Sequence, residues 1–92
     1  MAHTKRTALI TGSGRNIGRA VALALAEDGF DVVVNGSSDR AACERVVNEA
    51  EKLGVKATIA MGDVGKAEDC RRIATNAIAL NGEVDVLVHN AA

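Results

Sequence analysis

The chain has 92 residues, of which 48% are hydrophobic and 25% are charged, and its net charge at pH 7 is -1. This composition provides no excess of positive charge for binding nucleic acid, and no apolar run approaches the ~20 residues that a membrane span needs. The N-terminus runs directly into an apolar segment without a signal-peptide pattern, so we expect a cytoplasmic protein.

The first predicted unit is a strand, a glycine-rich turn and a helix. The β-type run Thr7–Thr11 ends at Gly12, and a helix is expected from Arg15 to about Asp28, where Gly29 stops it. Helical spacing of apolar residues predicts the buried stripe of this helix as Ile17, Val21, Ala24 and Leu25.

Strands and helices then alternate. The β-branched run Asp31–Asn35 is typical of a strand buried on both faces, and a helix follows from about Arg40 to Leu53. We expect a third strand at Lys56–Met61, a third helix from Lys66 to about Asn81 and a fourth strand at Val84–His89. The predicted stripe of the third helix is Cys70, Ile73, Ala74, Ala77 and Ile78.

The two cysteines, Cys43 and Cys70, lie in separate helical patterns without metal-ligand spacing. We interpret both as free thiols in or near the core.

This βαβαβαβ order with short connections predicts an α/β fold with a parallel sheet. Right-handed crossovers place the first two helices on one face, and a fourth strand beside the first gives the order 3-2-1-4. We therefore predict a Rossmann-type doubly wound sheet, of which residues 1–92 form only the N-terminal half. Its bare apolar edge would make the unit unstable or sticky alone.

Ligands bind to doubly wound folds at the carboxyl ends of the strands, where the strand order reverses. Three segments meet there, namely Gly12–Gly18, Asp63-Val64 and Asn90-Ala91-Ala92. A helix that begins after a glycine-rich turn offers backbone N–H groups to a phosphate. The sequence therefore predicts a nucleotide site, with a plain glycine-rich turn as the alternative.

The spacing of Gly12, Gly14 and Gly18 is one residue too wide for the common G-x-G-x-x-G fingerprint. TGSGRNIG instead resembles the TGxxxGxG loop of the short-chain dehydrogenase/reductase family. DVVVN is similar to the second strand of that family, GDV to its adenine-contacting loop and VDVLVHNAA to its VDxLVNNAG segment. The resemblance is nearest to the 3-oxoacyl-(acyl carrier protein) reductase branch and covers only the N-terminal portion of the family.

The resemblance implies hydride transfer between a nicotinamide and a small carbonyl or alcohol substrate, by a homo-oligomeric enzyme. Gly12 would permit the tight turn, the backbone of Ser13–Ile17 would approach the pyrophosphate, and Gly18 would let the helix pack closely. Asp63 would accept a hydrogen bond from the adenine amino group with Val64 against the ring, and Asn90 would contact the ribose. The implied cofactor-binding residues are Gly12, Ser13, Gly14, Arg15, Asn16, Ile17, Gly18, Ser37, Ser38, Asp63, Val64 and Asn90.

The chain departs from the family pattern at three points. Asn16 replaces the middle glycine of the family loop, and it is the non-glycine residue most tolerant of a positive φ. Gly14 is an extra glycine that could restore freedom to the loop. His89 and Ala92 replace the first Asn and the final Gly of the NNAG segment, and we interpret His89 as a packed or hydrogen-bonded residue rather than a catalyst.

The end of the second strand favours NADP(H) over NAD(H). NAD sites place an acidic residue there for the ribose 2′-OH, whereas this chain has Asn35-Gly36-Ser37-Ser38. Asp31 faces the other end of the strand, and we interpret Asp39 as a helix cap. Ser37 and Ser38 could bind a 2′-phosphate, with Arg15 and Arg40 as candidate cations.

In the resembled family, a Tyr and a Lys transfer the proton with help from a Ser and an Asn, and all four lie downstream of the NNAG segment. These 92 residues contain no tyrosine, so no residue is assigned as catalytic. Three hypotheses remain: the truncated N-terminal part of an NADP-dependent carbonyl reductase, a non-catalytic half-domain that pairs with another chain, and an unrelated receiver-like α/β domain. The third is disfavoured because Thr11 ends the first strand with no acidic pair beside it.

Overall fold

The computed structural model describes residues 6–91 and contains every element that the sequence predicts. The elements, in chain order, are β1 (Thr7–Ile10), α1 (Asn16–Glu27), β2 (Asp31–Val34), α2 (Arg40–Lys52), β3 (Ala57–Ile59), α3 (Ala67–Asn81) and β4 (Val86–Val88). β3 and β4 are shorter than expected because each lies at an edge and pairs on one side only. The pairing nevertheless continues past β3, where the Ala60 N–H donates to Val34 O at 2.9 Å.

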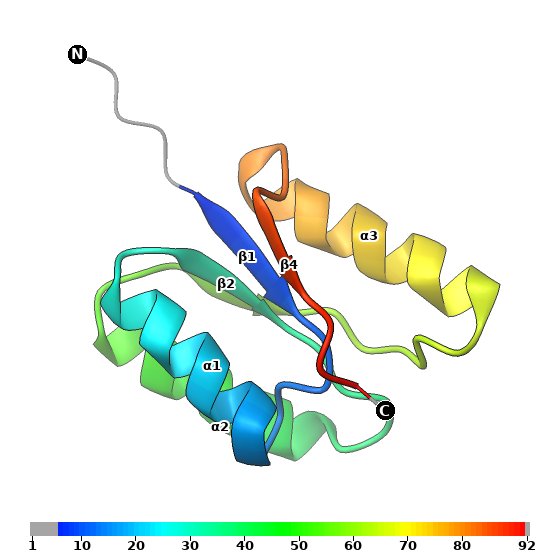
Figure 1. Ribbon diagram of the computed structural model, residues 1–92, viewed down its shortest axis with the longest axis horizontal. Coiled ribbons are helices and arrows are strands. Elements are labelled where there is room, and N and C mark those ends of the chain that lie inside the picture. Colours follow the sequence, from blue (N-terminus) through cyan, green and yellow to red (C-terminus); the bar gives the residue numbers. More distant parts are fainter. Residues whose placement is uncertain (1–5, 92) are drawn as a thin grey trace.

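The four strands form one parallel sheet in the order β3-β2-β1-β4, as predicted. α1 and α2 cover one face and α3 covers the other (Figure 1). Because side chains alternate along a strand, Ala8 and Ile10 face α1 and α2, while Leu9 faces α3. This is the Rossmann-type α/β arrangement, and it places the carboxyl ends of β1, β2 and β4 at one edge of the molecule (Figure 1).

The predicted stripe of α1 is half right. Val21 and Leu25 are partly buried and pack against the core, whereas Ile17 is 72% exposed and Ala24 is also exposed. The buried residues of the helix are Gly18, Ala22 and Ala26. α1 packs against both the sheet and α2 through these small residues, and this close approach turns Ile17 toward solvent. Arg19 also joins α1 to α2, because its guanidinium donates to the Glu49 carboxylate from Nε at 3.0 Å and from Nη2.

The predicted stripe of α3 is too wide. Only Ile73 and Ala77 are buried, and Cys70, Ala74 and Ile78 are exposed. The cause is that α3 has no neighbouring helix on its face of the sheet within the described residues, so only its central line meets the strands. Cys70 is therefore not a core thiol, whereas Cys43 is free and fully buried as expected.

An apolar surface remains open beside α3 and β4. Leu87 is 64% exposed and Ile78 is 46% exposed, and with Leu9, Ala74 and Val84 they line an open cavity of about 350 Å³. The bare apolar edge expected from the strand order is therefore present at β4. Within residues 6–91, no helix has the length and apolar character needed to cross a membrane.

Candidate functional site

A cavity of about 470 Å³ opens at the carboxyl ends of β1, β2 and β4. Its size falls in the range of small-molecule sites, roughly 300–1,000 Å³, and it lies where the strand order reverses. Three loops line it, and their lining residues are Gly12, Gly14, Arg15, Asn16, Asn35, Gly36, Ser37, Ser38, Asp39, Ala42, Cys43, Asn90 and Ala91.

The glycine-rich loop makes a tight turn between β1 and α1. Gly12 has φ +64°, a backbone conformation that side chains rarely adopt. A Cβ on Gly18 would lie 2.2 Å from the Gly12 carbonyl oxygen, so α1 can begin this close to the loop only with glycine there. Gly14 has no positive φ; a Cβ there would lie 3.2 Å from Cys43 Sγ, so close packing against α2 favours glycine at this position.

The N-terminus of α1 is open toward the cavity. Arg15 occupies the N-cap position in an extended conformation, no side chain in residues 6–91 caps the helix, and its first turn has no acidic residue. Asn16 follows with φ +55°, the positive value that the sequence suggested it could tolerate. Unpaired N–H groups and the positive end of the helix dipole favour an anion at this place. The site therefore fits a phosphate group.

Ser13 does not present its backbone to the cavity. Its N–H donates to Asn35 O at 2.8 Å, its hydroxyl donates to Ile10 O at 2.6 Å, and the side chain is buried. This N–H is therefore paired within the chain and is not free to donate to a pyrophosphate, while the approach of the Ser13–Ile17 backbone to that group stays a prediction. Ser13 instead joins the glycine loop to the end of β2.

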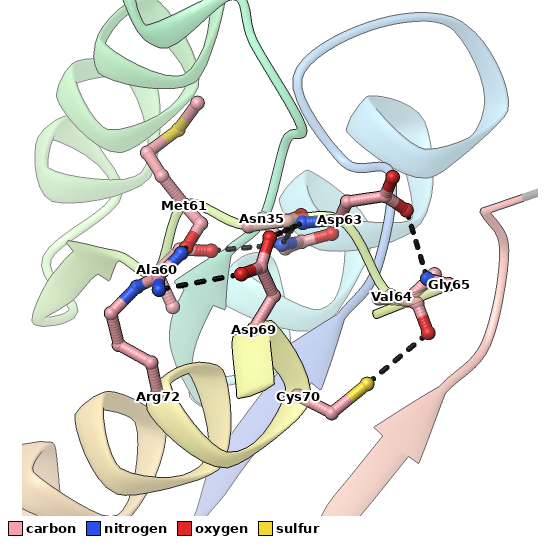
Figure 2. A network of polar contacts seen from close by, with 10 residues as sticks. Asn35, Ala60, Met61, Asp63, Val64, Gly65, Asp69, Cys70 and Arg72 are labelled. Carbon is pink, nitrogen blue, oxygen red and sulfur yellow. Dashed lines mark hydrogen bonds and ion pairs between the residues drawn. The ribbon is translucent and has the colours of Figure 1, made fainter. Parts of the chain in front are cut away.

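Asn35 is a residue that the sequence analysis did not assign to the site. Its side chain is buried and accepts from the Gly12 N–H at 3.0 Å. It also donates to Ala60 O at 2.8 Å and to Gly62 O at 3.2 Å, and Figure 2 shows it beside Ala60. It thereby connects the loops that follow β1, β2 and β3. A polar residue at the end of a buried valine run was the available signal.

The segment after β4 is held against the end of β1 by Thr11. The Thr11 hydroxyl oxygen accepts from the N–H groups of Asn90 at 3.0 Å and Ala91 at 3.1 Å, and it contacts His89 Nδ1 at 3.3 Å. Asn90 Nδ2 donates to Gly12 O at 3.1 Å. His89 is therefore hydrogen-bonded, as interpreted, and Asn90 connects the segment after β4 to the loop after β1. Ala92 lies outside the described residues.

The loop after β2 brings two serines and a charged pair to the cavity. Ser37 and Ser38 are exposed and line it. Asp39 caps α2, as expected, by accepting from the Ala42 N–H at 3.0 Å, and its other oxygen accepts from Arg15 Nη2 at 2.7 Å. Arg40 lies outside the cavity and pairs with Glu44 at 3.4 Å. Of the two candidate cations, the structure brings Arg15 to the site.

The loop after β3 is held by the first turns of α3 (Figure 2). The Asp63 N–H donates to Asp69 Oδ2 at 2.8 Å, and Asp63 Oδ1 accepts from the Gly65 N–H at 2.8 Å. Arg72 Nη2 donates to Met61 O at 3.2 Å. The hydrogen bond from Asp63 and the nearby Arg72 lower the pKa of Asp69. Asp63 and Val64 do not line the cavity, so this loop lies beside it rather than in it.

Cys43 lies beneath the cavity, between the two loops. A Cβ on Gly36 would lie 2.7 Å from its sulfur atom. Burial, with a smaller contribution from Asp39, raises the pKa of the Cys43 thiol. The side chain is therefore a neutral packing group at neutral pH, and this agrees with its interpretation as a core thiol.

A family model described as short chain dehydrogenase matches residues 6–92. The chain belongs to this family. It is 42% identical over 88 residues to a 3-oxoacyl-[acyl-carrier-protein] reductase FabG of Staphylococcus epidermidis, with 94% of this chain and 35% of that protein aligned. A short-chain dehydrogenase/reductase of Pestalotiopsis microspora is 38% identical over 86 residues, with 94% and 32% aligned.

Solved structures of two dehydrogenases share the fold. The crystal structure of hydroxysteroid dehydrogenase from Escherichia coli matches with a TM-score of 0.89 and 35% identity, over 97% of this chain and 37% of that one. Acetoin dehydrogenase YohF from Salmonella typhimurium matches with a TM-score of 0.87 and 33% identity, over 96% and 36%. The chain thus spans about a third of the length of these relatives.

The cavity is lined by seven of the twelve residues that the sequence predicts for the cofactor site. They are Gly12, Gly14, Arg15, Asn16, Ser37, Ser38 and Asn90. The predicted residues outside its lining are Ser13, Ile17, Gly18, Asp63 and Val64. Two lining residues that the sequence did not assign to the site, Asn35 and Asp39, form hydrogen bonds to the glycine-rich loop. These bonds join segments that are distant in the sequence.

Proposed function

We propose that this chain forms the cofactor-binding part, in a single dinucleotide-binding domain, of an NADP(H)-dependent oxidoreductase. The observation that carries the proposal is the uncapped N-terminus of α1, which opens into a cavity at the reversal of strand order. The nicotinamide supplies or accepts the hydride, and a carbonyl or alcohol compound is the substrate. The proposal retains the homo-oligomeric state and cytoplasmic location expected from the sequence.

The role proposed for each residue follows from the polar atoms that it can still offer to a ligand. The backbone at the start of α1, with Asn16 in its left-handed conformation, would hold the pyrophosphate. Asn90, whose amide nitrogen fixes Gly12, would turn its carbonyl oxygen to the ribose. Asp63 has one oxygen bound to the Gly65 N–H, and the other would accept from the adenine amino group, with Val64 against the ring.

Preference for NADP(H) would come from Arg15, Ser37 and Ser38. These side chains line the same part of the cavity, and each donates hydrogen bonds that a 2′-phosphate accepts. No carboxylate occurs at positions 35–38, where an NAD site would hold the ribose 2′-OH. Among residues 6–91, the only acidic residue that lines the cavity is Asp39, and its two oxygens accept from the Ala42 N–H and from Arg15.

The test is a binding titration of the protein at its natural length with NADPH and NADH. We expect tighter binding of NADPH, and Arg15→Gln should reduce that preference about tenfold or more, the worth of one charge-assisted hydrogen bond. Arg40→Gln is the matched control, since Arg40 lies outside the cavity, and it should leave the preference unchanged. Equal affinity for the two nucleotides, or an equal effect of both substitutions, would refute the assignment.

The open apolar surface at Leu87 and Ile78 favours a second candidate, a non-catalytic half-domain completed by another chain. The intact mass of the protein isolated from its source separates the two. A mass well above the 9.5 kDa of these residues supports the oxidoreductase. A mass of 9.5 kDa together with a co-purifying chain supports the second candidate.

A further inference from the structure

An ion pair spans the part of the cavity that faces the loop after β2. Arg15 comes from the glycine-rich loop and Asp39 from the start of α2, and both side chains line the cavity. Arg15 Nη2 donates to Asp39 Oδ2 at 2.7 Å, with side-chain exposures of 64% and 44%. The one cation that lines the cavity beside Ser37 and Ser38 is therefore already paired with a carboxylate of the same chain.

The two partners differ in how firmly they are held. Asp39 Oδ1 accepts from the Ala42 N–H at 3.0 Å, so the carboxylate is fixed at the beginning of α2. The only side-chain hydrogen bond of Arg15 within the described residues is the one to Asp39. A ligand that needs the guanidinium must consequently draw Arg15 away from a fixed anion, or bind beside that anion.

We propose that Asp39 is a specificity-determining residue that competes with a 2′-phosphate for Arg15 and so limits the preference of this chain for NADP(H) over NAD(H). The inference rests on the proposed function. Two physical effects act in the same direction. The carboxylate occupies the Nη2 donor of Arg15, which would otherwise be available to the phosphate. Its charge also opposes a second anion at the N-terminus of α2, where the helix dipole alone would attract one.

Asp39→Asn tests this directly, because asparagine removes the charge and still caps a helix. The probes are adenosine 2′,5′-bisphosphate and adenosine 5′-monophosphate, titrated by calorimetry at low salt into the protein at its natural length. We expect the substitution to tighten the bisphosphate about two- to fivefold, the upper part of the range of exposed charge pairs. The monophosphate affinity should change less than about twofold, and added salt should shrink the gain.

Glu44→Gln is the matched control, since it removes one carboxylate from the same helix, paired with Arg40 and outside the cavity. It should leave the ratio of the two affinities unchanged. Asp39→Ser, which also keeps a capping side chain, repeats the test should the first variant fold poorly. A merely structural role of Asp39 would weaken both probes equally.

The outcomes are distinct. The deciding quantity is the affinity for the bisphosphate divided by the affinity for the monophosphate. If Asp39→Asn leaves this ratio at or below the wild-type value, or if Glu44→Gln raises it by as much as Asp39→Asn does, the inference is overturned and the proposed function stays intact. A wild-type protein that binds neither adenosine compound overturns the proposed function, and the inference with it.

Discussion

Alanine at position 18 should disrupt the glycine loop at its tightest point. The added Cβ would lie 2.2 Å from Gly12 O and 2.7 Å from Asn90 Nδ2. Both contacts are well inside van der Waals distance, and the first is a backbone atom that cannot rotate away. The substitution must therefore displace the Gly12 turn or the start of α1.

Two opposing effects determine how much Gly18→Ala changes the free energy of unfolding. Overpacking of a tight site costs about 1–3 kcal/mol, and replacing glycine by alanine in a helix returns about 0.5–1 kcal/mol. Since the clash is with backbone, we expect the upper part of the first range and a net loss of about 1–2 kcal/mol. In a domain of the relatives' length, about three times that of this chain, each kcal/mol lowers the melting temperature by roughly 2–4 °C.

Urea unfolding followed by circular dichroism measures the loss, and nucleotide binding should fall with it because Gly12 moves. The control is Ala24→Gly, an exposed position in the same helix, which measures the glycine–alanine term alone in α1. If Gly18→Ala raised the free energy of unfolding by as much as Ala24→Gly lowers it, the close approach of loop and helix would be refuted.

Three further predictions address the hydrogen bonds and thiols. Asn35→Ala should lower the free energy of unfolding by about 2–3 kcal/mol in urea titrations, because it leaves three backbone partners on two neighbouring loops unpaired. A loss below 0.5 kcal/mol, roughly the low end for one hydrogen bond, would contradict this network. Because the pKa of Asp69 is lowered, its contribution to the stability of the folded state is complete above the ordinary value of 3.8 and is lost as the pH falls through the lowered pKa. Amide exchange protection of Asp63 should follow that loss, and protection that persists in Asp69→Ala, which has no side-chain acceptor, would argue against it. Iodoacetamide at pH 8 should label exposed Cys70 at least about tenfold faster than buried Cys43, whose pKa is raised; equal rates by mass spectrometry would contradict the burial.

The order of elements and the topology were predictable because the signals are local and periodic. β-branched runs alternate with helical spacing, and the handedness of crossovers leaves few arrangements for four parallel strands. The buried face of α1 was not predictable in the same way, because periodicity favours large side chains. Close packing selected Gly18 and Ala22 instead and left Ile17 in solvent.

In the candidate site, too, some residues were predictable from the sequence and others were not. The glycine loop, Ser37, Ser38 and Asn90 were found because their positions at strand ends follow from topology. The Arg15–Asp39 pair and the inward turn of Ser13 were missed. Both depend on which atoms of distant segments come within hydrogen-bond distance, and spacing along the chain does not encode that.

The central claim is that a dinucleotide phosphate binds at the N-terminus of α1. Amide chemical shifts of the isotope-labelled protein at its natural length, titrated with NADP+, test it most directly. The account predicts the largest changes at residues 12–18, 37–38 and 90, with small changes in the second half of α3. Changes that avoid the glycine loop, or no saturable change at all, would contradict it.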